Sequence, residues 1–233
     1  MKPYYEQPDV TLYLADCREV LPTLAADSVD LIVTDPPYGV KWQSNRRALA
    51  FDAIAGDDST EAAVIGLGLA LPSLRRGRHL YAFGRYDLSA LPLAGPAELI
   101  WDKEIFSGGD LTIPWGVQHE PIAFYVNNKD GKLNRTPDGA LTARLRRGSV
   151  LRVPRLNATA IAQHPTEKPV ELLRQLIESS SIMGELVLDP FVGSGSTLVA
   201  ARAEGRRAVG IEVEERYCDV AATRLERMGS LFL

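Results

Sequence analysis

A carboxylate, two prolines and an aromatic residue stand together in the string Asp35-Pro36-Pro37-Tyr38, directly after the apolar run 31–33. Two successive prolines fix φ and remove two N–H donors, so they predict a rigid turn whose carbonyl groups are held in set directions. The Asp35 carboxylate and the Pro36 carbonyl then offer two acceptors for the two hydrogens of an amino group. Tyr38 adds an aromatic face on which a planar ring can stack. The alternative is an ordinary Pro-Pro turn, but this combination of residues is rare by chance.

A second candidate site is a strand–turn–helix segment at 186–197. Glycines in its turn permit positive φ and let a ligand approach the backbone closely, and the start of the following helix offers N–H and hydroxyl donors to an anionic group such as a carboxylate. The dinucleotide pattern GxGxxG is incomplete because position 198 is leucine, and GxxxxGK[ST] is absent, so nucleotide phosphates are not the favoured ligand. A simple tight turn is the alternative. The candidate cofactor-binding residues here are Asp189, Pro190, Phe191, Gly193, Gly195, Ser196 and Thr197.

An acidic residue, Glu212, ends the next apolar run, 17 residues beyond Gly195. In nucleoside-binding α/β sheets an acid at this place binds ribose hydroxyls, which makes Glu212 a candidate for the same contact. A solvated acid at the start of a helix is the alternative.

Short apolar runs rich in β-branched residues recur along the chain, and several are continuously apolar, as strands covered on both faces are. Strands that alternate with helical patterns predict an α/β fold with a doubly wound, mostly parallel sheet of seven strands. The predicted strands are 11–14, 31–34, 79–83, 98–101, 121–126, 186–188 and 208–211.

Three helices are predicted in the second half of the chain. Thr166 is placed to cap a helix that runs through Val170 and Ile177, with Pro169 in its first turn. A second helix begins near Ser196 and stops at Gly205. A third runs from about residue 214 and places apolar residues at i, i+3, i+4 spacing.

The stretch 127–162 interrupts this rhythm, because it is rich in Asn, Gly, Arg and Pro and has no clear period. It is interpreted as a small insertion in a single domain that covers residues 1–233. The net charge of the chain is −4, yet residues 127–156 hold eight Lys and Arg against two Asp. A basic segment on an acidic body suggests a local contact with a polyanion, with a solvated loop as the alternative.

Composition excludes several classes of protein. The N-terminal residues lack the apolar stretch of a signal peptide, and the longest apolar run is too short to span a bilayer. The two cysteines, Cys17 and Cys218, have no CxxC spacing and indicate small buried residues in a reduced, cytoplasmic protein. The three histidines are scattered singly, so no metal site is predicted.

Taken together, these strings resemble the DNA amino-methyltransferases, which carry a D/N/S-P-P-Y/F/W catalytic motif and an F-x-G-x-G cofactor motif. Here the catalytic motif comes first in the chain, as in the circularly permuted beta group of that family. The resemblance implies S-adenosylmethionine as cofactor, double-stranded DNA as partner, and direct methyl transfer to the amino group of a flipped-out base. It assigns the catalytic role to Asp35, Pro36, Pro37 and Tyr38.

Two further strings match this family. The string 164–169, with Thr166 and Lys168, is similar to the segment that lies against the methionine end of the cofactor. The string 14–17 is similar to a strand end where Asp16, followed by Cys17, contacts the adenine amino group of the cofactor. His119-Glu120 also resembles the family but receives no role.

The insertion 127–162 occupies the place of the family's target-recognition region and is small for it. Either it recognises a short site, or a second subunit completes the DNA contact. Members of the beta group often pair, so the resemblance implies a homodimer. The candidate DNA-binding residues are Arg46, Arg47, Arg144, Arg146, Arg147, Arg152 and Arg155.

Adenine N6 is the expected target, because Asp at the first catalytic position leans towards adenine in the family and Ser towards cytosine. The alternatives that stay open are cytosine N4, RNA, a protein glutamine, and a nucleic-acid-binding module that has kept the fold without the chemistry.

Overall fold

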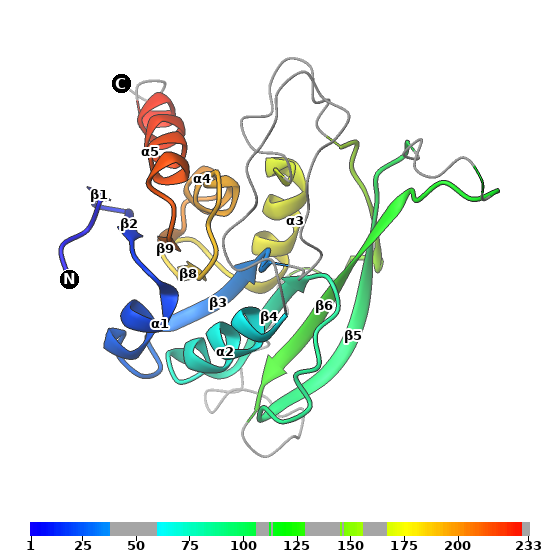
Figure 1. The fold of residues 1–233 in the computed structure, drawn as a ribbon, viewed down its shortest axis with the longest axis horizontal. Helices are drawn as coiled ribbons and strands as arrows, with labels where there is room; N and C mark the ends of the chain where they lie inside the picture. Colours follow the sequence, from blue (N-terminus) through cyan, green and yellow to red (C-terminus); the bar gives the residue numbers. More distant parts are fainter. Residues whose placement is uncertain are drawn as a thin grey trace.

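The computed structural model describes residues 1–37, 60–105, 112, 114–128, 145, 147–155 and 167–229. Among these residues it has one nine-stranded sheet with the order β1-β2-β9-β8-β3-β4-β6-β5-β7 (Figure 1). The strands are β1 (Tyr5–Gln7), β2 (Val10–Leu14), β3 (Val29–Thr34), β4 (Leu74–Phe83), β5 (Leu93–Asp102), β6 (His119–Asn127), β7 (Val150–Arg152), β8 (Leu186–Asp189) and β9 (Arg207–Glu212). The helices are α1 (Cys17–Val20), the 3-10 helix η1 (Leu21–Thr23), α2 (Glu61–Ala70), α3 (Val170–Ser180), α4 (Ser196–Ala203) and α5 (Glu215–Gly229).

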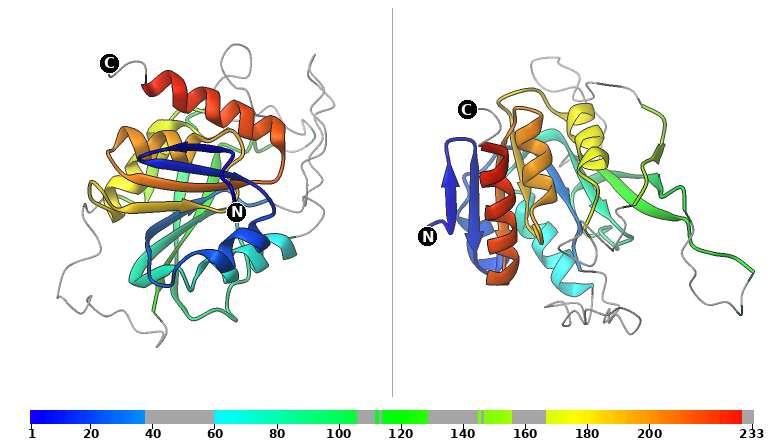
Figure 2. Two further views of the ribbon diagram at one scale, coloured as in Figure 1. Left: turned by 90° about the vertical axis from the view of Figure 1, so that its left-hand side faces the viewer. Right: turned by 90° about the horizontal axis from the view of Figure 1, so that it is seen from above.

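The helices cover both faces of the sheet, which gives three layers (Figures 1 and 2). α3, α4 and α5 pack on one face in a core that includes Leu31 and Val33. α1, η1 and α2 pack on the other face, where Ile32 belongs to the core. Alternate residues of β3 therefore enter opposite cores, which explains why this strand is continuously apolar at 31–33.

The direction of winding reverses between β3 and β8, which are parallel neighbours. The chain passes from β8 through α4 to β9 on one side of this boundary, and from β3 through α2 to β4 on the other side. Open α/β sheets bind ligands in the crevice outside the carboxyl ends of strands at such a reversal. The boundary therefore marks where a site is expected.

The doubly wound, mostly parallel sheet predicted from the sequence is confirmed, and all seven predicted strands are present. Five of the eight strand pairings are parallel. The predicted number of strands was too small, because β1 and β7 are added at the two edges of the sheet.

The predicted helix start at Thr166 is wrong. α3 begins at Val170, and its N-cap is Pro169, which makes no side-chain capping bond. Thr166 itself lies outside the described residues. Both ends of α4 and the start of α5 agree with the prediction to within two residues, and Gly205 after α4 has a φ of +69°.

The predicted insertion is described at residues 127, 128, 145 and 147–155. Part of it returns to the sheet as β7, which pairs in parallel with β5. Trp101 of β5 fixes this return, because its indole N–H donates to the Val153 carbonyl at 2.7 Å. The role of the segment as a separate target-recognition region stays a prediction.

Among the helices of the described residues, none has the length and apolarity that crossing a bilayer requires.

Candidate active site

The two turns singled out in the sequence lie at the carboxyl ends of β3 and β8, on either side of the winding reversal. A buried hydrogen bond joins them: the Thr34 hydroxyl donates to Asp189 Oδ1 at 2.6 Å. These residues are 155 positions apart in the chain. The fold therefore brings the predicted catalytic turn and the predicted cofactor turn together in one site.

The Asp189 carboxylate is buried and accepts hydrogen bonds from the second turn. It is 2% exposed, and Oδ1 also accepts from the Phe191 backbone N–H at 3.0 Å. Burial raises the pKa of Asp189 to about 6, although the bonds from the Thr34 and Thr197 hydroxyls and from the Phe191 N–H oppose this shift. The described contacts of this side chain are thus internal ones, and its predicted contact with a cofactor stays a prediction.

The catalytic turn is described through Pro37, and Tyr38 lies outside the described residues. The Pro36 carbonyl accepts a hydrogen bond at 2.9 Å from the hydroxyl of Tyr86, a buried residue that follows β4. A carbonyl oxygen has two lone pairs, so this bond leaves capacity for a second donor. No local pattern in the sequence indicates a role for Tyr86, which lies 50 residues from Pro36 in an irregular segment.

Asp35 contacts a buried cation. Lys168 Nζ lies 2.6 Å from Asp35 Oδ2 and 3.1 Å from Glu120 Oε1. The sequence predicts that Lys168 binds the cofactor, and it predicts no role for Glu120. Burial lowers the pKa of Lys168, but the attraction of Asp35 and Glu120 is stronger, so the pKa lies above its ordinary value and the ammonium stays charged.

The glycine turn is bonded to the end of β9. Glu212 Oε2 accepts from the Gly193 N–H at 2.8 Å, and Oε1 accepts from the Glu214 N–H at 2.9 Å. Burial raises the pKa of Glu212, and these backbone bonds oppose the rise. The carboxylate thus lies beside the turn, as expected for an acid that binds ribose hydroxyls, and each oxygen has a further lone pair for that contact.

Gly195 meets two requirements at once. Its φ is +85°, a left-handed conformation that favours glycine, and a Cβ there would lie 2.7 Å from the Ala221 Cβ of α5. The glycine is therefore needed for the packing of α5, whether or not a ligand also approaches it. Ser196 and Thr197 follow in the first turn of α4, both buried.

Arg224 of α5 was missed by sequence reasoning. Its Nη1 donates to the Ser194 carbonyl at 2.8 Å, the Ser194 hydroxyl at 3.0 Å and the Ser196 hydroxyl at 3.1 Å. Its Nη2 lies 3.0 Å from Glu167 Oε1. The guanidinium therefore ties the glycine turn to the segment that contains Lys168.

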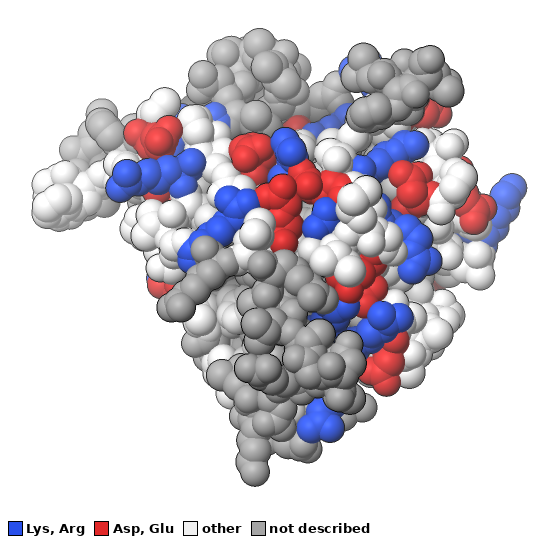
Figure 3. Space-filling model, turned by 180° about the vertical axis from the view of Figure 1, so that it is seen from behind, with Lys and Arg blue, Asp and Glu red and all other residues white. Residues whose placement is uncertain are grey.

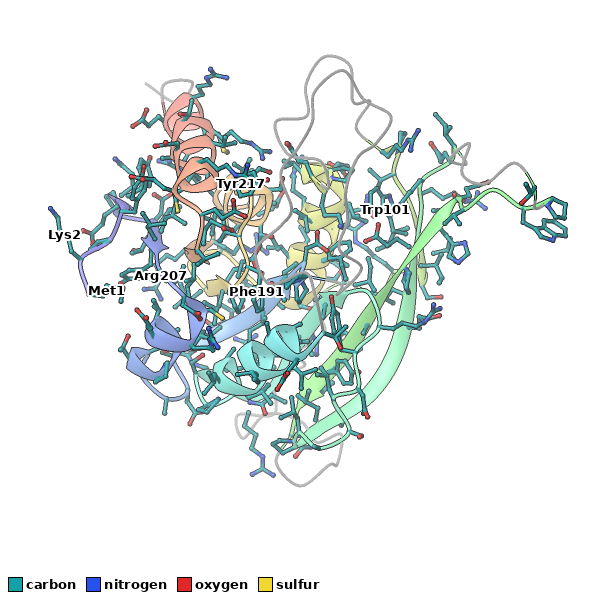
Figure 4. The ribbon with its side chains drawn as sticks, in the orientation of Figure 1. Met1, Lys2, Trp101, Phe191, Arg207 and Tyr217 are labelled. Atoms are coloured by element: carbon teal, nitrogen blue, oxygen red, sulfur yellow. The ribbon has the colours of Figure 1, made fainter. Side chains whose placement is uncertain are left out.

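Phe191, which is labelled in Figure 4, follows β8 and packs against α2 near the start of α1. A Cβ at Gly66 of α2 would lie 2.6 Å from Phe191 Cζ and 3.2 Å from Cys17 Sγ, so the phenyl ring packs over a glycine and beside the thiol. Asp16 accepts from the Arg18 N–H at 2.8 Å and caps α1. The Arg18 side chain, hydrogen-bonded to the Asp16 carboxylate, holds the pKa of that carboxyl below its usual value.

The predicted DNA-binding residues are described in part. Arg147 pairs with Glu178 at 2.5 Å. Arg152 lies 3.7 Å from Asp102 and keeps 73% of its side chain exposed, and Arg155 is exposed. On the face seen in Figure 3, basic and acidic side chains are interspersed over the described residues, so this face does not present a continuous basic surface. Four of the predicted residues lie outside the described part of the chain: Arg46, Arg47, Arg144 and Arg146.

No group of three or more His, Cys, Asp or Glu side chains that could hold a metal ion is found within the described ranges. Both cysteines are free and buried. What the arrangement offers is a pair of acceptors, Asp35 and the Pro36 carbonyl, beside a turn with an acidic residue and a helix N-terminus. This suits transfer of a group from a nucleoside-containing donor to an amine.

A family model described as "DNA methylase", for N6 and N4 methyltransferases, matches residues 98–223, which is more than half of the chain. The match includes the glycine turn, Glu212, Glu120 and Lys168.

Curated relatives match over nearly the whole chain. YubD of Escherichia coli (strain K12) is 32% identical over 90% of this chain and 87% of its own. Type II methyltransferase M.ScaI of Streptomyces caespitosus is 28% identical over 97% of this chain and 84% of its own. DNA adenine methyltransferase YhdJ of Escherichia coli (strain K12) is 27% identical over 93% of this chain and 82% of its own.

Solved structures share the fold. M1.HpyAVI in complex with SAM superposes with a TM-score of 0.69 at 19% identity, covering 93% of this chain and 98% of its own. The cytosine-N4-specific PvuII DNA methyltransferase also has a TM-score of 0.69, at 15% identity, covering 99% of this chain and 94% of its own.

Proposed function

The chain belongs to the DNA methylase family, and we propose that its target is the N6 amino group of adenine in double-stranded DNA. It is an S-adenosylmethionine-dependent methyltransferase that acts on an exocyclic amino group. The observation that carries the proposal is the position of Asp35 and the Pro36 carbonyl at the end of β3, joined through Thr34 to the cofactor turn after β8.

The choice of adenine rests on two points. Asp35 stands at the first catalytic position, where the family's tendency is towards adenine. YhdJ, which matches 93% of this chain, is named as a DNA adenine methyltransferase. PvuII, named as cytosine-specific, shares the fold at 15% identity, and this supports no statement about the base.

The residues at the site fit S-adenosylmethionine. The Glu212 carboxylate lies beside the glycine turn and suits ribose hydroxyls, while the N-terminus of α4 suits the carboxylate of the methionine part. Phe191 and Cys17 form an apolar wall for the adenine ring, next to Asp16. The sulfonium supplies an activated methyl group, so the work of this chain is mainly to position the amine.

An exocyclic amine is a poor nucleophile, because its lone pair is delocalised into the base ring. In the proposed mechanism the base leaves the duplex and stacks on Tyr38. Its two amino hydrogens are donated to Asp35 and to the Pro36 carbonyl, which favours a pyramidal nitrogen with its lone pair directed at the methyl group. After transfer, one proton leaves the nitrogen to solvent or through Asp35.

DNA is held, in this proposal, by the basic segment. Its arginines contact phosphates, and such contacts fix the register of the duplex without reading its sequence. The proposed phosphate-binding residues are Arg147, Arg152 and Arg155, together with Arg46, Arg47, Arg144 and Arg146. We also propose that two copies of the chain act together and that the protein works in the cytoplasm, where both thiols would stay reduced.

The test is nucleoside mass spectrometry of unmethylated DNA incubated with the protein and S-adenosylmethionine. We expect N6-methyladenine with the wild type and with Asp219→Ala, an exposed carboxylate of α5, and none with Asp35→Ala. Asp35→Ala should still bind the cofactor. Appearance of N4-methylcytosine instead would move the target to cytosine, and wild-type product from Asp35→Ala would refute the mechanism.

A further inference from the structure

Lys168 belongs to a row of four side chains whose charges alternate in sign. Its ammonium contacts Asp35 at 2.6 Å and Glu120 at 3.1 Å, and Glu120 Oε2 in turn contacts Lys103 at 2.9 Å. The row runs from the end of β3, through the residue before Pro169, to the start of β6 and the residue after β5. Four separate segments are thus joined through charged side chains.

The Lys168 side chain is one of the least exposed charged side chains in the described part of the chain, at 6%, whereas those of Asp35 and Glu120 are 21% and 17% exposed. It lies 5.0 Å from the centre of the Phe83 ring, which adds a cation–π contact. A buried cation is stable only when it is well paired, so the two carboxylates are what allow Lys168 to occupy this place.

We infer that Lys168 and Glu120 are positioning residues for methyl transfer: Lys168 holds the Asp35 carboxylate in its orientation and charge state, and Glu120 holds Lys168. This rests on the proposed function of Asp35. A carboxylate has about four lone-pair positions, so Asp35 can accept from Lys168 and from an amino group together. Without the cation, rotation of Asp35 would misplace the acceptor, and a misplacement of about 1 Å costs about 10²-fold in rate.

The charges that surround Asp35 determine what each substitution does. Lys168 is the cation in contact, Glu120 and Lys103 follow along the row, and Asp189 of β8 also interacts with Asp35 electrostatically. Glu167, the neighbour of Lys168, is paired with Arg224. Lys168→Gln removes a cation in contact with Asp35, which makes protonation of Asp35 easier. Glu120→Gln removes a carboxylate and leaves the cation, which makes protonation harder.

The experiment measures single-turnover methyl transfer against pH, at saturating S-adenosylmethionine, for wild type, Lys168→Gln, Glu120→Gln and the surface control Lys2→Gln. We expect Lys168→Gln to lose about 10²-fold in rate at neutral pH. Its acid limb should move up by about one pH unit, and that of Glu120→Gln should move down. Cofactor affinity, measured by calorimetry, should stay within about threefold of wild type for each variant, and Lys2→Gln should match wild type throughout.

Shifts of opposite direction are a signature that loss of packing cannot produce. A uniform loss of rate at every pH, or a loss of cofactor affinity with a normal rate at saturation, overturns the inference. If Lys168→Gln does not fold, the near-isosteric Glu120→Gln still decides, because an unmoved or raised acid limb contradicts the role. A wild type without methyl transfer to DNA refutes the proposed function itself and the inference with it.

Discussion

Asp189 is a carboxylate held almost wholly out of water at the end of β8, where it accepts bonds from Thr34 and Phe191. Burial raises its pKa to about 6 from its ordinary value of 3.8. A group whose pKa is raised by folding contributes stability that is present below its unfolded pKa and lost as pH rises through the folded pKa. Ionised Asp189 therefore costs stability at neutral pH.

We expect the free energy of unfolding of wild type, relative to Asp189→Asn, to fall by on the order of 3 kcal/mol between about pH 4 and about pH 7. The amide is neutral throughout, so hydrogen bonds lost in the variant add a constant and leave the slope unaffected. Urea unfolding of both proteins across this range measures it. A difference that does not change with pH would mean that Asp189 is not desolvated as described.

At the scale of elements, α2 packs closely against Phe191 at a glycine. The ring of Phe191 packs over Gly66, where a Cβ would lie 2.6 Å from Phe191 Cζ, whereas a Cβ at Gly68 of the same helix would meet nothing closer than Leu91 at 3.4 Å. Gly66 thus lets the helix approach the wall of the proposed cofactor site.

Gly66→Ala should displace the Phe191 ring and weaken S-adenosylmethionine binding by about tenfold, equivalent to about 1.4 kcal/mol. Gly68→Ala is the matched control, because it has the same change in helix propensity, about 1 kcal/mol in favour of the helix, without the contact. Calorimetric titration of both variants gives the comparison. Equal affinities in the two variants would remove Phe191 from the cofactor site.

The apolar pattern of the sequence predicted the central strands of the sheet but not the two at its edges. Apolar runs such as 31–34 identified every central strand, because burial on both faces demands them. β1 and β7 were missed because each has three residues and lies at an edge, where burial imposes little pattern. β5 is much longer than its predicted run 98–101. The prediction is too short because Gly95 and Pro96 are typical turn residues, whereas in the structure they lie within the strand, at an irregularity between Ala94 and Ala97.

The candidate site was predictable where it follows from strand ends, since parallel strands place their carboxyl ends together. Contacts between distant side chains were not predictable. Lys168 meets Asp35 across 133 residues, and Tyr86 meets Pro36 across 50, through loops whose paths no local pattern fixes. Tyr38 and Thr166 lie outside the described residues, so their predicted roles stay predictions.

At the scale of the whole molecule, the chain has a net charge of −4 and interspersed charges on the face of Figure 3. We therefore expect DNA binding to depend on a local basic region. Arg152 and Arg155 are exposed members of the proposed region, whereas Arg147 is partly engaged by Glu178.

Replacing Arg152 and Arg155 together by Gln should weaken DNA binding and reduce the slope of log K against log salt concentration by about two, or about one for each lost phosphate contact. Arg207→Gln is the control, since Arg207 begins β9, at the end of the parallel strands opposite to the carboxyl ends where the site lies. Binding isotherms at several salt concentrations test this. An unchanged slope would exclude both residues from the phosphate contact.

The bond from Thr34 to Asp189 has a thermodynamic consequence. This buried hydrogen bond connects the end of β3, which carries the acceptor pair, to the end of β8, which carries the proposed cofactor turn. A shift of either strand end would therefore disturb the other. We therefore expect the two proposed ligands of the site, the cofactor and the base, to be thermodynamically linked. By reciprocity, whatever factor the cofactor adds to the affinity for the base, the base must add to the affinity for the cofactor.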